Sequence, residues 1–434
     1  MQSASEAEAI VQKGRSKKYL AFLEITAFLG WAMVVYEWNL FGDLIGPVSK
    51  ILNLNASQTA YFLALIQFTM VPIILLVGYF IDIFGRKIMY SVILFIASIL
   101  TALTGFAVLA GLGTAVAARA GTQGAAQNEQ SVAASLTSEE MPAKLRGFLY
   151  SIIQSGWPVG VTLAAAIVVG LYPILGFKYI WFIAVIPLVL IAVSRFWIKE
   201  SVRFEKVVEA RKNIKDATVD KFVNRSAVTR IPIRQAFGKD VRKDTIKAML
   251  LYTLYLAGQV PVVVLAAYYM EIILHFPVVT ATSIISIGAA LTIPGYWING
   301  LISEKIGRRN TGIIGTLLAL AGVIWFATSG HSYILILSAY SFSSFWVNGN
   351  FANVINQINE NVPTRVRGTV NVLSTALGQV GWGVGDLIYG LFLSAVGATG
   401  VMIIFSTVTF AISIGIFVSW RNVKPGTPLE AIAT

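Results

Sequence analysis

The feature that most constrains the fold is a succession of long apolar stretches. Twelve stretches of roughly 20 residues or more follow one another along the 434 residues, and this is the length at which an α-helix crosses a lipid bilayer. Period-2 alternation is absent, and an open sheet cannot sit in lipid. The sequence therefore predicts an all-α integral membrane protein with twelve transmembrane helices. They are expected near residues 20–48, 59–82, 88–108, 111–137, 146–172, 179–198, 245–271, 280–303, 310–329, 332–357, 367–392 and 397–420.

The two halves of the chain carry the same motif. Residues 78–87 read GYFIDIFGRK and close the second stretch, and residues 300–309 read GLISEKIGRR and close the eighth, 222 residues later. A second pattern, Glu-x-x-Pro-x-x-x-Arg-Gly, begins at Glu139 and again at Glu360, 221 residues apart. Many matched positions at one spacing indicate a duplicated unit. We therefore expect two pseudo-symmetric six-helix bundles.

Charge predicts the orientation of these bundles. Basic residues gather at alternate hinges, and by the positive-inside rule those hinges and both termini are cytoplasmic. We expect a multi-pass protein of the plasma membrane, with its first apolar stretch retained because it is too long for the core of a signal peptide. The chain divides into a cytoplasmic N-terminal tail (1–19), an N-terminal six-helix bundle (20–198), a cytoplasmic linker (199–244), a C-terminal six-helix bundle (245–420) and a cytoplasmic tail (421–434).

Composition excludes several functional classes. Charged residues make up 12% of the chain, against about 25% in soluble domains, so the net charge of +12 reports topology and argues against nucleic-acid binding. The chain has no cysteine, which excludes disulfides and thiolate metal sites, and only two histidines. It shows no Ser/His/Asp set and no phosphate-cradling glycine loop. We expect no enzymatic activity, no cofactor and no metal.

Twelve predicted spans, two similar halves and the doubled Gly-x-x-x-Asp/Glu-x-x-Gly-Arg-Lys/Arg motif resemble the major facilitator superfamily of secondary transporters, over the whole chain. The resemblance implies that the motif latches the halves together on the cytoplasmic side, with its acid near a helix N-terminus of the other half. Gly78 and Gly300 permit close helix approach, and Gly85 and Gly307 permit tight turns. The predicted gating residues are Gly78, Asp82, Gly85, Arg86, Lys87, Glu139, Arg146, Gly300, Glu304, Arg308, Arg309, Glu360 and Arg367.

The sequence resembles two branches of this family and does not distinguish between them. The step of ten residues from Arg119 to Glu129 is similar to the metabolite:proton symporters. Residues 200–204, Gln154 and Gln259 instead resemble positions in sugar porters. Each branch implies a small organic substrate.

Ionisable side chains within the spans are candidates for proton coupling, because each costs roughly 2.5–3.5 kcal/mol to insert. Glu37 and Arg119 lie at similar depths in the first and fourth spans, which predicts a contact between them. Arg119 favours an ionised Glu37, and loss of that contact in a buried site favours a protonated one. A fixed structural ion pair is the alternative. Glu129 and Asp386 are further candidates, and Asp386 is also compatible with a solvated outer vestibule.

Neutral polar side chains mark the expected substrate cavity. Carboxamides offer both donors and acceptors, while indoles offer flat apolar faces. This chemistry suits a small polyol or zwitterion, and a monocarboxylate met by Arg119 is also compatible. The predicted substrate-binding residues are Trp38, Asn39, Gln123, Gln127, Gln154, Trp157, Tyr255, Gln259, Asn350, Gln379 and Trp382.

These observations predict a secondary active transporter that moves a small polar metabolite (a sugar, zwitterion or monocarboxylate) by alternating access, with proton symport. Its partners are the substrate, protons and the lipid bilayer, and we expect a monomer. Two alternatives stay open: a proton-independent facilitator of a sugar-like solute, and a receptor that binds solute without transporting it.

Overall fold

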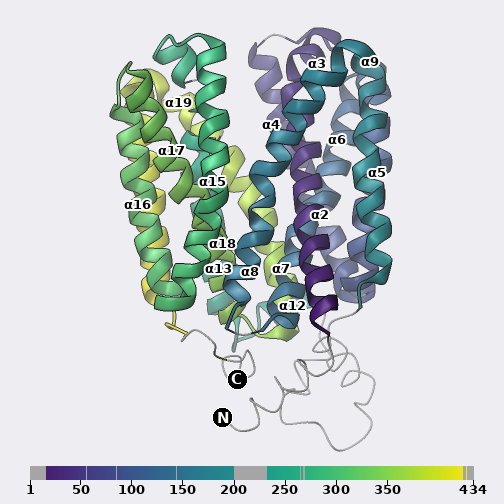
Figure 1. Ribbon diagram of the computed structural model, residues 1–434, viewed down its shortest axis with the longest axis vertical. Coiled ribbons are helices and arrows are strands. Elements are labelled where there is room, and N and C mark those ends of the chain that lie inside the picture. Colours follow the sequence, from purple (N-terminus) through teal and green to yellow (C-terminus); the bar gives the residue numbers. More distant parts are fainter. Residues whose placement is uncertain are drawn as a thin grey trace, which may run out of the picture.

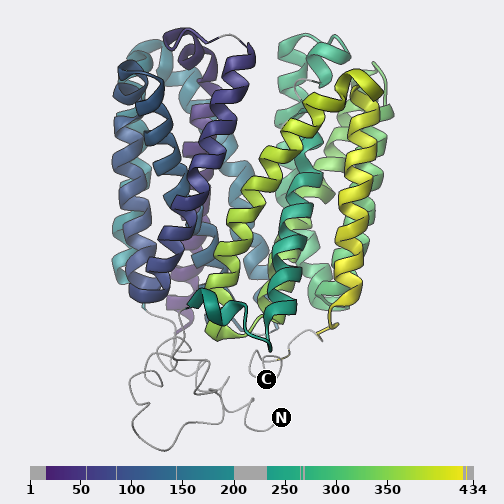
Figure 2. The same cartoon turned by 180° about the vertical axis from the view of Figure 1, so that it is seen from behind.

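The computed structural model of the chain has only helices as regular structure in the part that it describes. That part comprises residues 16–199 except 55, 85 and 143, residues 232–423 except 264, 267 and 268, and Thr427. The helices form two bundles that stand side by side with their long axes in the same direction (Figures 1 and 2). The predicted all-α fold with two halves is confirmed. Most of the predicted linker (199–244) and most of each predicted tail lie outside the described residues.

The helix boundaries follow the predicted spans closely. The first bundle contains α2 (Lys17–Asp43), α3 (Ile45–Ile51), α4 (Ala56–Phe84), α5 (Arg86–Ala110), α6 (Leu112–Ala126), α7 (Asn128–Glu140), α8 (Arg146–Gln154) and α9 (Gly156–Ser194), followed by the 3₁₀ turn η1 (Arg195–Trp197). The second contains α12 (Pro232–Ala236), α13 (Arg242–Val263), the π-helical turn η2 (Tyr269–Ile273), α15 (Val278–Ile306), α16 (Arg308–Thr328), α17 (Tyr333–Gly349), α18 (Phe351–Asn361) and α19 (Thr364–Ser419). The first and seventh spans end earlier than expected, at Asp43 and Val263.

Three glycines turn the chain where two helices meet. Gly176 divides α9 and Gly397 divides α19, with φ angles of 66° and 71°, so each of these elements holds two spans. Gly307 joins α15 to α16 with a φ of 87°. This left-handed backbone strains residues with a Cβ, so the predicted tight turn at Gly307 is confirmed. Its counterpart Gly85 lies outside the described residues.

Nine helical segments of the described chain are long and apolar enough to cross a membrane. The other three predicted spans are also helical. The fourth is interrupted between α6 and α7, the tenth between α17 and α18, and the eleventh is the glycine-rich first part of α19. These three spans are more polar, which is compatible with lipid only when they face the protein interior.

Compared with a soluble protein, the distribution of side chains is reversed, with apolar residues on the outer surface and polar residues in the interior. Large apolar residues cover the outside, such as Phe95, Leu190 and Leu391, which are 52%, 64% and 73% exposed. Arg119 and Gln357, by contrast, are completely buried. Lipid tails solvate apolar groups and offer polar groups no hydrogen bond. The pattern therefore supports a membrane-embedded fold.

The two bundles approach each other in symmetry-related pairs. A Cβ built on Gly78 of α4 would lie 2.2 Å from Val372 Cγ1 of α19, and one on Gly300 of α15 would lie 2.6 Å from Ser151 Oγ of α8. Val372 and Ser151 are 221 residues apart, which is a spacing of the sequence repeat. The predicted role of both glycines in close helix approach is confirmed.

Lys17, at the start of α2, and Ser419, at the end of α19, lie at the same end of the molecule, which we call the terminal end (Figure 1). We call the opposite end the far end. At the terminal end α7 and α8 of the first bundle contact α15, α18 and α19 of the second. The bundles are therefore joined at the terminal end.

Candidate functional site

A cavity lies between the two bundles. It is lined by Trp31, Trp38, Gln127, Gln130, Gln154, Trp157, Tyr252, Leu256, Gln259, Val263, Tyr296, Asn348, Phe351, Gln379 and Trp382. None of these fifteen residues carries a charge, seven are aromatic and six are carboxamides. About 30 Å³ is open to the centre of a water molecule, within an empty space of about 410 Å³ that includes solvent at its mouth. The cavity thus has room for only a few waters as it stands.

Three helix interruptions adjoin this cavity. Gln127 separates α6 from α7, Ser155 separates α8 from α9, and Asn350 separates α17 from α18. Gln127 is itself on the wall, Gln154 precedes Ser155, and Phe351 follows Asn350. All three residues keep φ and ψ angles in the right-handed helical region, so the helices are bent at these points and not unwound. Three local bends therefore adjoin the cavity.

Seven of the eleven predicted substrate-binding residues lie on the cavity wall. They are Trp38, Gln127, Gln154, Trp157, Gln259, Gln379 and Trp382. They come from both bundles, as expected for a site between two repeats. Their contact with a substrate stays a prediction.

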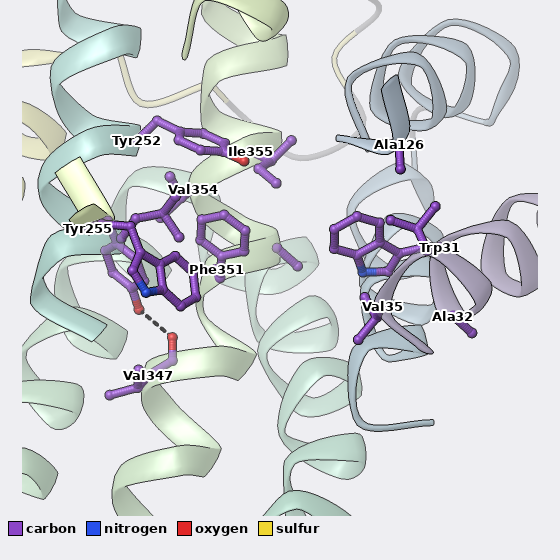
Figure 3. Packing of buried hydrophobic residues seen from close by; sticks show 14 of the residues in the cluster. Trp31, Ala32, Val35, Ala126, Tyr252, Tyr255, Val347, Phe351, Val354 and Ile355 are labelled. Carbon is purple, nitrogen blue, oxygen red and sulfur yellow. Dashed lines mark hydrogen bonds between the residues drawn. The ribbon is translucent and has the colours of Figure 1, made fainter. Parts of the chain in front are cut away.

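The other four do not line the cavity in this structure. Tyr255 Oη donates to the Val347 carbonyl at 3.0 Å, as Figure 3 shows, and Asn350 Nδ2 donates to Thr316 Oγ1 at 3.2 Å. Asn39 Nδ2 donates to a carbonyl of its own helix. Gln123 lies beside the ion pair described below. Each of these side chains is engaged by another group of the protein, which residue type alone does not reveal.

Eight wall residues were not among the predicted substrate contacts. They are Trp31, Gln130, Tyr252, Leu256, Val263, Tyr296, Asn348 and Phe351. Trp31 lies seven residues before Trp38 on α2, two helical turns away and on the same face, so helical periodicity was a usable signal for it. Gln130 lies three residues after Gln127, whose backbone is right-handed helical, so helical periodicity was a usable signal for it as well.

The predicted contact between Glu37 and Arg119 is present. Both side chains are buried, and Arg119 Nη1 donates to Glu37 Oε1. The Arg119 guanidinium also lies over the Phe41 ring, 4.2 Å from its centroid. In the orientation that satisfies its neighbours, the Gln123 amide oxygen accepts from Arg119 Nη2 at 3.1 Å and from Trp38 Nε1 at 3.3 Å. One amide therefore links the ion pair to the cavity wall.

The other two predicted proton-coupling residues are Glu129 and Asp386. Glu129 is completely buried in the first turn of α7 and is not on the cavity wall. Asp386 lies in α19, and its side chain is outside the described residues. Among the described residues, no three His, Cys, Asp or Glu side chains form a group that could hold a metal ion.

The second copy of the repeated motif forms an ionic cluster between the bundles. Glu304 Oε1 accepts from the backbone N–H groups of Gly147 at 2.7 Å and Phe148 at 3.2 Å, in the first turn of α8. Its other oxygen pairs with Arg308 at 3.0 Å, and Arg308 Nε pairs with Glu360 at 3.1 Å. The expected acid at a helix N-terminus of the other half is confirmed here, where free N–H groups and the helix dipole favour a carboxylate. We call Glu304, Arg308 and Glu360 the latch.

The remaining predicted gating residues differ in position. Arg367 is buried and donates to the carbonyls of Asn359 and Val362 at the end of α18. Arg146 Nη2 lies 3.3 Å from the Thr427 carbonyl. Arg309 follows Arg308 in α16 and has no ion-pair partner among the described residues. The side chains of Asp82, Arg86, Lys87 and Glu139 lie outside the described residues, so the first copy of the latch stays a prediction.

Polar contacts between the bundles close the cavity toward the terminal end. Tyr252 Oη donates to Gln130 Oε1 at 2.6 Å, and the hydroxyls of Ser131 and Thr375 lie 3.1 Å apart. Nearer the terminal end, Asn371 Nδ2 donates to a serine of α7 at 3.2 Å. Each contact joins one bundle to the other. They must break if the terminal end is to open.

Comparison with known proteins agrees with this architecture. The chain is 21% identical to a provisionally named metabolite transport protein of Haemophilus influenzae over 379 residues, 84% of this chain and 87% of that one. It is 22% identical to a provisionally named niacin/nicotinamide transporter, NiaP, of Bacillus subtilis over 375 residues, 84% and 86% of the two chains.

Solved structures show the same fold. The proton:xylose symporter XylE, bound to 6-bromo-6-deoxy-D-glucose, superposes with a TM-score of 0.78 at 15% identity, covering 97% of this chain and 100% of that one. At this identity the likeness concerns the fold alone. The family model of the Major Facilitator Superfamily matches residues 20–386. The chain therefore belongs to the Major Facilitator Superfamily, a family of membrane transporters and not of enzymes.

Proposed function

We propose that the chain is a proton-coupled symporter that moves a small polar metabolite by alternating access. The observation that carries this proposal is the buried pair of Glu37 and Arg119, linked through Gln123 to Trp38 on the cavity wall. A buried ion pair costs more desolvation than it returns unless its geometry is good, so it is weak evidence for stability alone. Beside a ligand cavity, a carboxylate that gains and loses a proton has a role for which an apolar pair could not substitute.

The proposed cycle starts from the state described here. In that state Glu37 is paired with Arg119, and the terminal end is closed by the latch and by the polar contacts between the bundles on that side of the cavity. A proton that reaches Glu37 removes its charge and weakens its hold on Arg119. Ligand that displaces Trp38 disturbs the same group through Gln123. Proton and ligand together then favour the state in which the far end closes and the terminal end opens.

We propose that the terminal end faces the cytoplasm. Arg308 and Arg367 lie near this end, together with the basic hinges of the first bundle. Basic hinges of membrane proteins stay on the cytoplasmic side. In this orientation the structure is closed toward the cytoplasm, and substrate enters from outside.

The test uses purified protein in liposomes with an imposed pH gradient. Radiolabelled xylose, lactate, glycine and nicotinamide are offered, and uphill uptake is compared with exchange at equal internal and external concentrations. Glu37→Gln should abolish uphill uptake and retain exchange, because the neutral amide keeps the shape of the side chain without its titration. The matched control is Asp43→Asn on the same helix, an exposed acid that should leave uphill uptake unchanged. Uphill uptake by Glu37→Gln at the wild-type level would refute the coupling role.

The same assay separates the two alternatives. A facilitator would equilibrate its solute at a rate independent of the pH gradient. A receptor would bind a solute without moving it. The buried ion pair beside the wall favours the coupled transporter over both.

A further inference from the structure

The cavity wall is unusually aromatic. Four of the ten tryptophans of the chain line it, although aromatic residues make up only 12% of the sequence. The rings of Trp31 and Trp157 lie 6.1 Å apart, those of Trp157 and Trp38 5.7 Å, and those of Trp38 and Trp382 5.8 Å. These four indoles form a continuous series that begins in the first bundle and crosses to the second, and we call them the indole wall. Trp38 and Trp157 are only half-buried, so ring surface remains for a ligand.

Two further rings lie on the other side of the cavity. Phe351 and Tyr252 are in contact at 5.4 Å between ring centroids. Figure 3 shows Phe351 of the second bundle and Trp31 of the first facing each other across the space between the bundles. A ligand in the cavity therefore has aromatic surface on both sides, an environment in which a planar ring gains stacking contacts.

The hydrogen-bonding groups of the wall favour a ligand with donors. Asn348 donates its amide nitrogen to the carbonyl of Ser344 at 3.2 Å and to its hydroxyl at 3.1 Å, and Gln259 donates one N–H to the Val347 carbonyl at 3.1 Å. The amide oxygens of both residues are left as acceptors for a ligand. Gln379 Oε1 is buried and has no partner among the described residues. All three oxygens belong to the second bundle.

The first bundle offers the complementary group. Trp31 Nε1 is a buried donor without a partner in the described part of the chain. An indole N–H can only donate, so it requires an acceptor on the ligand. A carboxamide supplies both kinds of group, with N–H donors for the oxygens of the second bundle and a carbonyl acceptor for Trp31 of the first.

Charge and shape narrow the class further. None of the fifteen wall residues is charged, and Arg119 is engaged by Glu37 behind the wall. A charged ligand would lose its hydration without gaining an ionic partner. A sugar carries hydroxyls around its whole rim, and the hydroxyls that face the seven aromatic wall residues, and not the six carboxamides, are left unpaired. Because the cavity is narrow, a flat molecule enters with the smallest displacement of the indoles.

We propose that the cavity binds a flat, uncharged aromatic ring that bears hydrogen-bond donors, with an aromatic carboxamide as the simplest example. The proposal rests on the proposed transport function, because it names the substrate class of the same site. The ring lies against the indole wall. The donors of the ligand reach the amide oxygens of the second bundle, and its acceptor reaches Trp31.

The test compares the binding of five ligands to the purified full-length protein. Benzamide has the ring and the amide, cyclohexanecarboxamide keeps the amide on a puckered ring, benzoate replaces the amide by a charge, and choline is a cation that aromatic faces also attract. D-Xylose is the polyol. Binding is read as thermal stabilisation and as quenching of tryptophan fluorescence. Benzamide should bind at least 10-fold more tightly than each of the others.

Variants locate the binding. Trp157→Leu should weaken benzamide binding at least 10-fold. Trp325→Leu is the control, because Trp325 lies on α16, is 40% exposed and is not on the wall. If Trp157→Leu fails to fold, Gln379→Leu takes its place, since it removes an amide oxygen and leaves the indoles intact.

Each unfavourable outcome has one meaning. Equal binding of cyclohexanecarboxamide and benzamide, tighter binding of xylose, benzoate or choline, or no stabilisation by benzamide at all overturns the proposed class. Flux measurements separate this result from the transport function. Proton-driven uptake of xylose without benzamide binding leaves the transporter standing and rejects the class. Benzamide binding without flux in liposomes supports the proposed ligand class and rejects the transport function.

Discussion

Replacement of Glu304 by glutamine should open the terminal end. The Glu304 carboxylate belongs to the second bundle and accepts from two backbone N–H groups of α8 in the first, at 2.7 and 3.2 Å. These hydrogen bonds exist only while the bundles are closed at this end. Arg308, which also pairs with Glu304, keeps Glu360 and the Ser303 carbonyl as partners in the variant. Glu304→Gln therefore weakens the closed state and has little effect on the open one.

The size of the effect follows from the type of contact. A hydrogen bond to a charged group contributes about 1.5–3 kcal/mol, and a negative charge at a helix N-terminus adds about 0.3–1 kcal/mol. Glutamine retains an acceptor oxygen, so part of the first contribution survives. We expect a net loss of about 2 kcal/mol, which corresponds to a roughly 25-fold larger open population.

The natural absence of cysteine makes the measurement direct. A thiol introduced by Ser131→Cys lies in the closed interface, since Ser131 is 4% exposed and contacts Thr375 of the other bundle. Its rate of alkylation by a maleimide reports the open population. Glu304→Gln should raise that rate roughly 25-fold. Asp240→Asn, at an acid 60% exposed and paired with Arg365, should change it little because surface pairs contribute little. Equal alkylation rates with and without Glu304→Gln would refute the latch.

Three further variants test other contacts. Gly78→Ala should raise alkylation of the same introduced thiol, because its Cβ would lie 2.2 Å from a side chain of α19, whereas Gly46→Ala, with nothing within 4 Å, should not. Glu37→Ala should lower unfolding stability by about 3–5 kcal/mol because Arg119 is left buried and unpaired, and removal of both charges should recover much of that loss in a thermal melt. Tyr255→Phe should cost about 1 kcal/mol of stability and leave ligand affinity unchanged, because its hydroxyl joins two helices and does not face the cavity.

The fold could be predicted because its signals are local or periodic. Apolar length indicates a span wherever it occurs, and the repeat relates the two halves without any knowledge of contacts. Gly78 and Gly300 illustrate this, since a glycine at the same place in both repeats indicated a close helix approach on both sides. The fourth and tenth spans are more polar than the others, yet each was recognised as an apolar stretch of spanning length.

The site could be predicted only in part. Depth along uninterrupted helices was enough to pair Glu37 with Arg119, because rise per residue is constant. Depth alone does not show in which direction a side chain points around its helix. Asn350 contacts α16, while Asn348, two residues earlier and about 200° away around the helix, lines the cavity. The sequence does not show which of these two faces is turned toward the cavity.

The proposed coupling between ligand and proton depends on the arrangement of α2. Glu37 and Trp38 are consecutive, so their side chains leave the helix about 100° apart. One points to Arg119 inside the bundle, and the other lies on the cavity wall. A ligand that shifts Trp38 also shifts the backbone that carries Glu37, and Gln123 contacts both Trp38 and Arg119. Coupling between substrate and ion pair then needs no long pathway, because sequence adjacency and one shared amide already join the two sites.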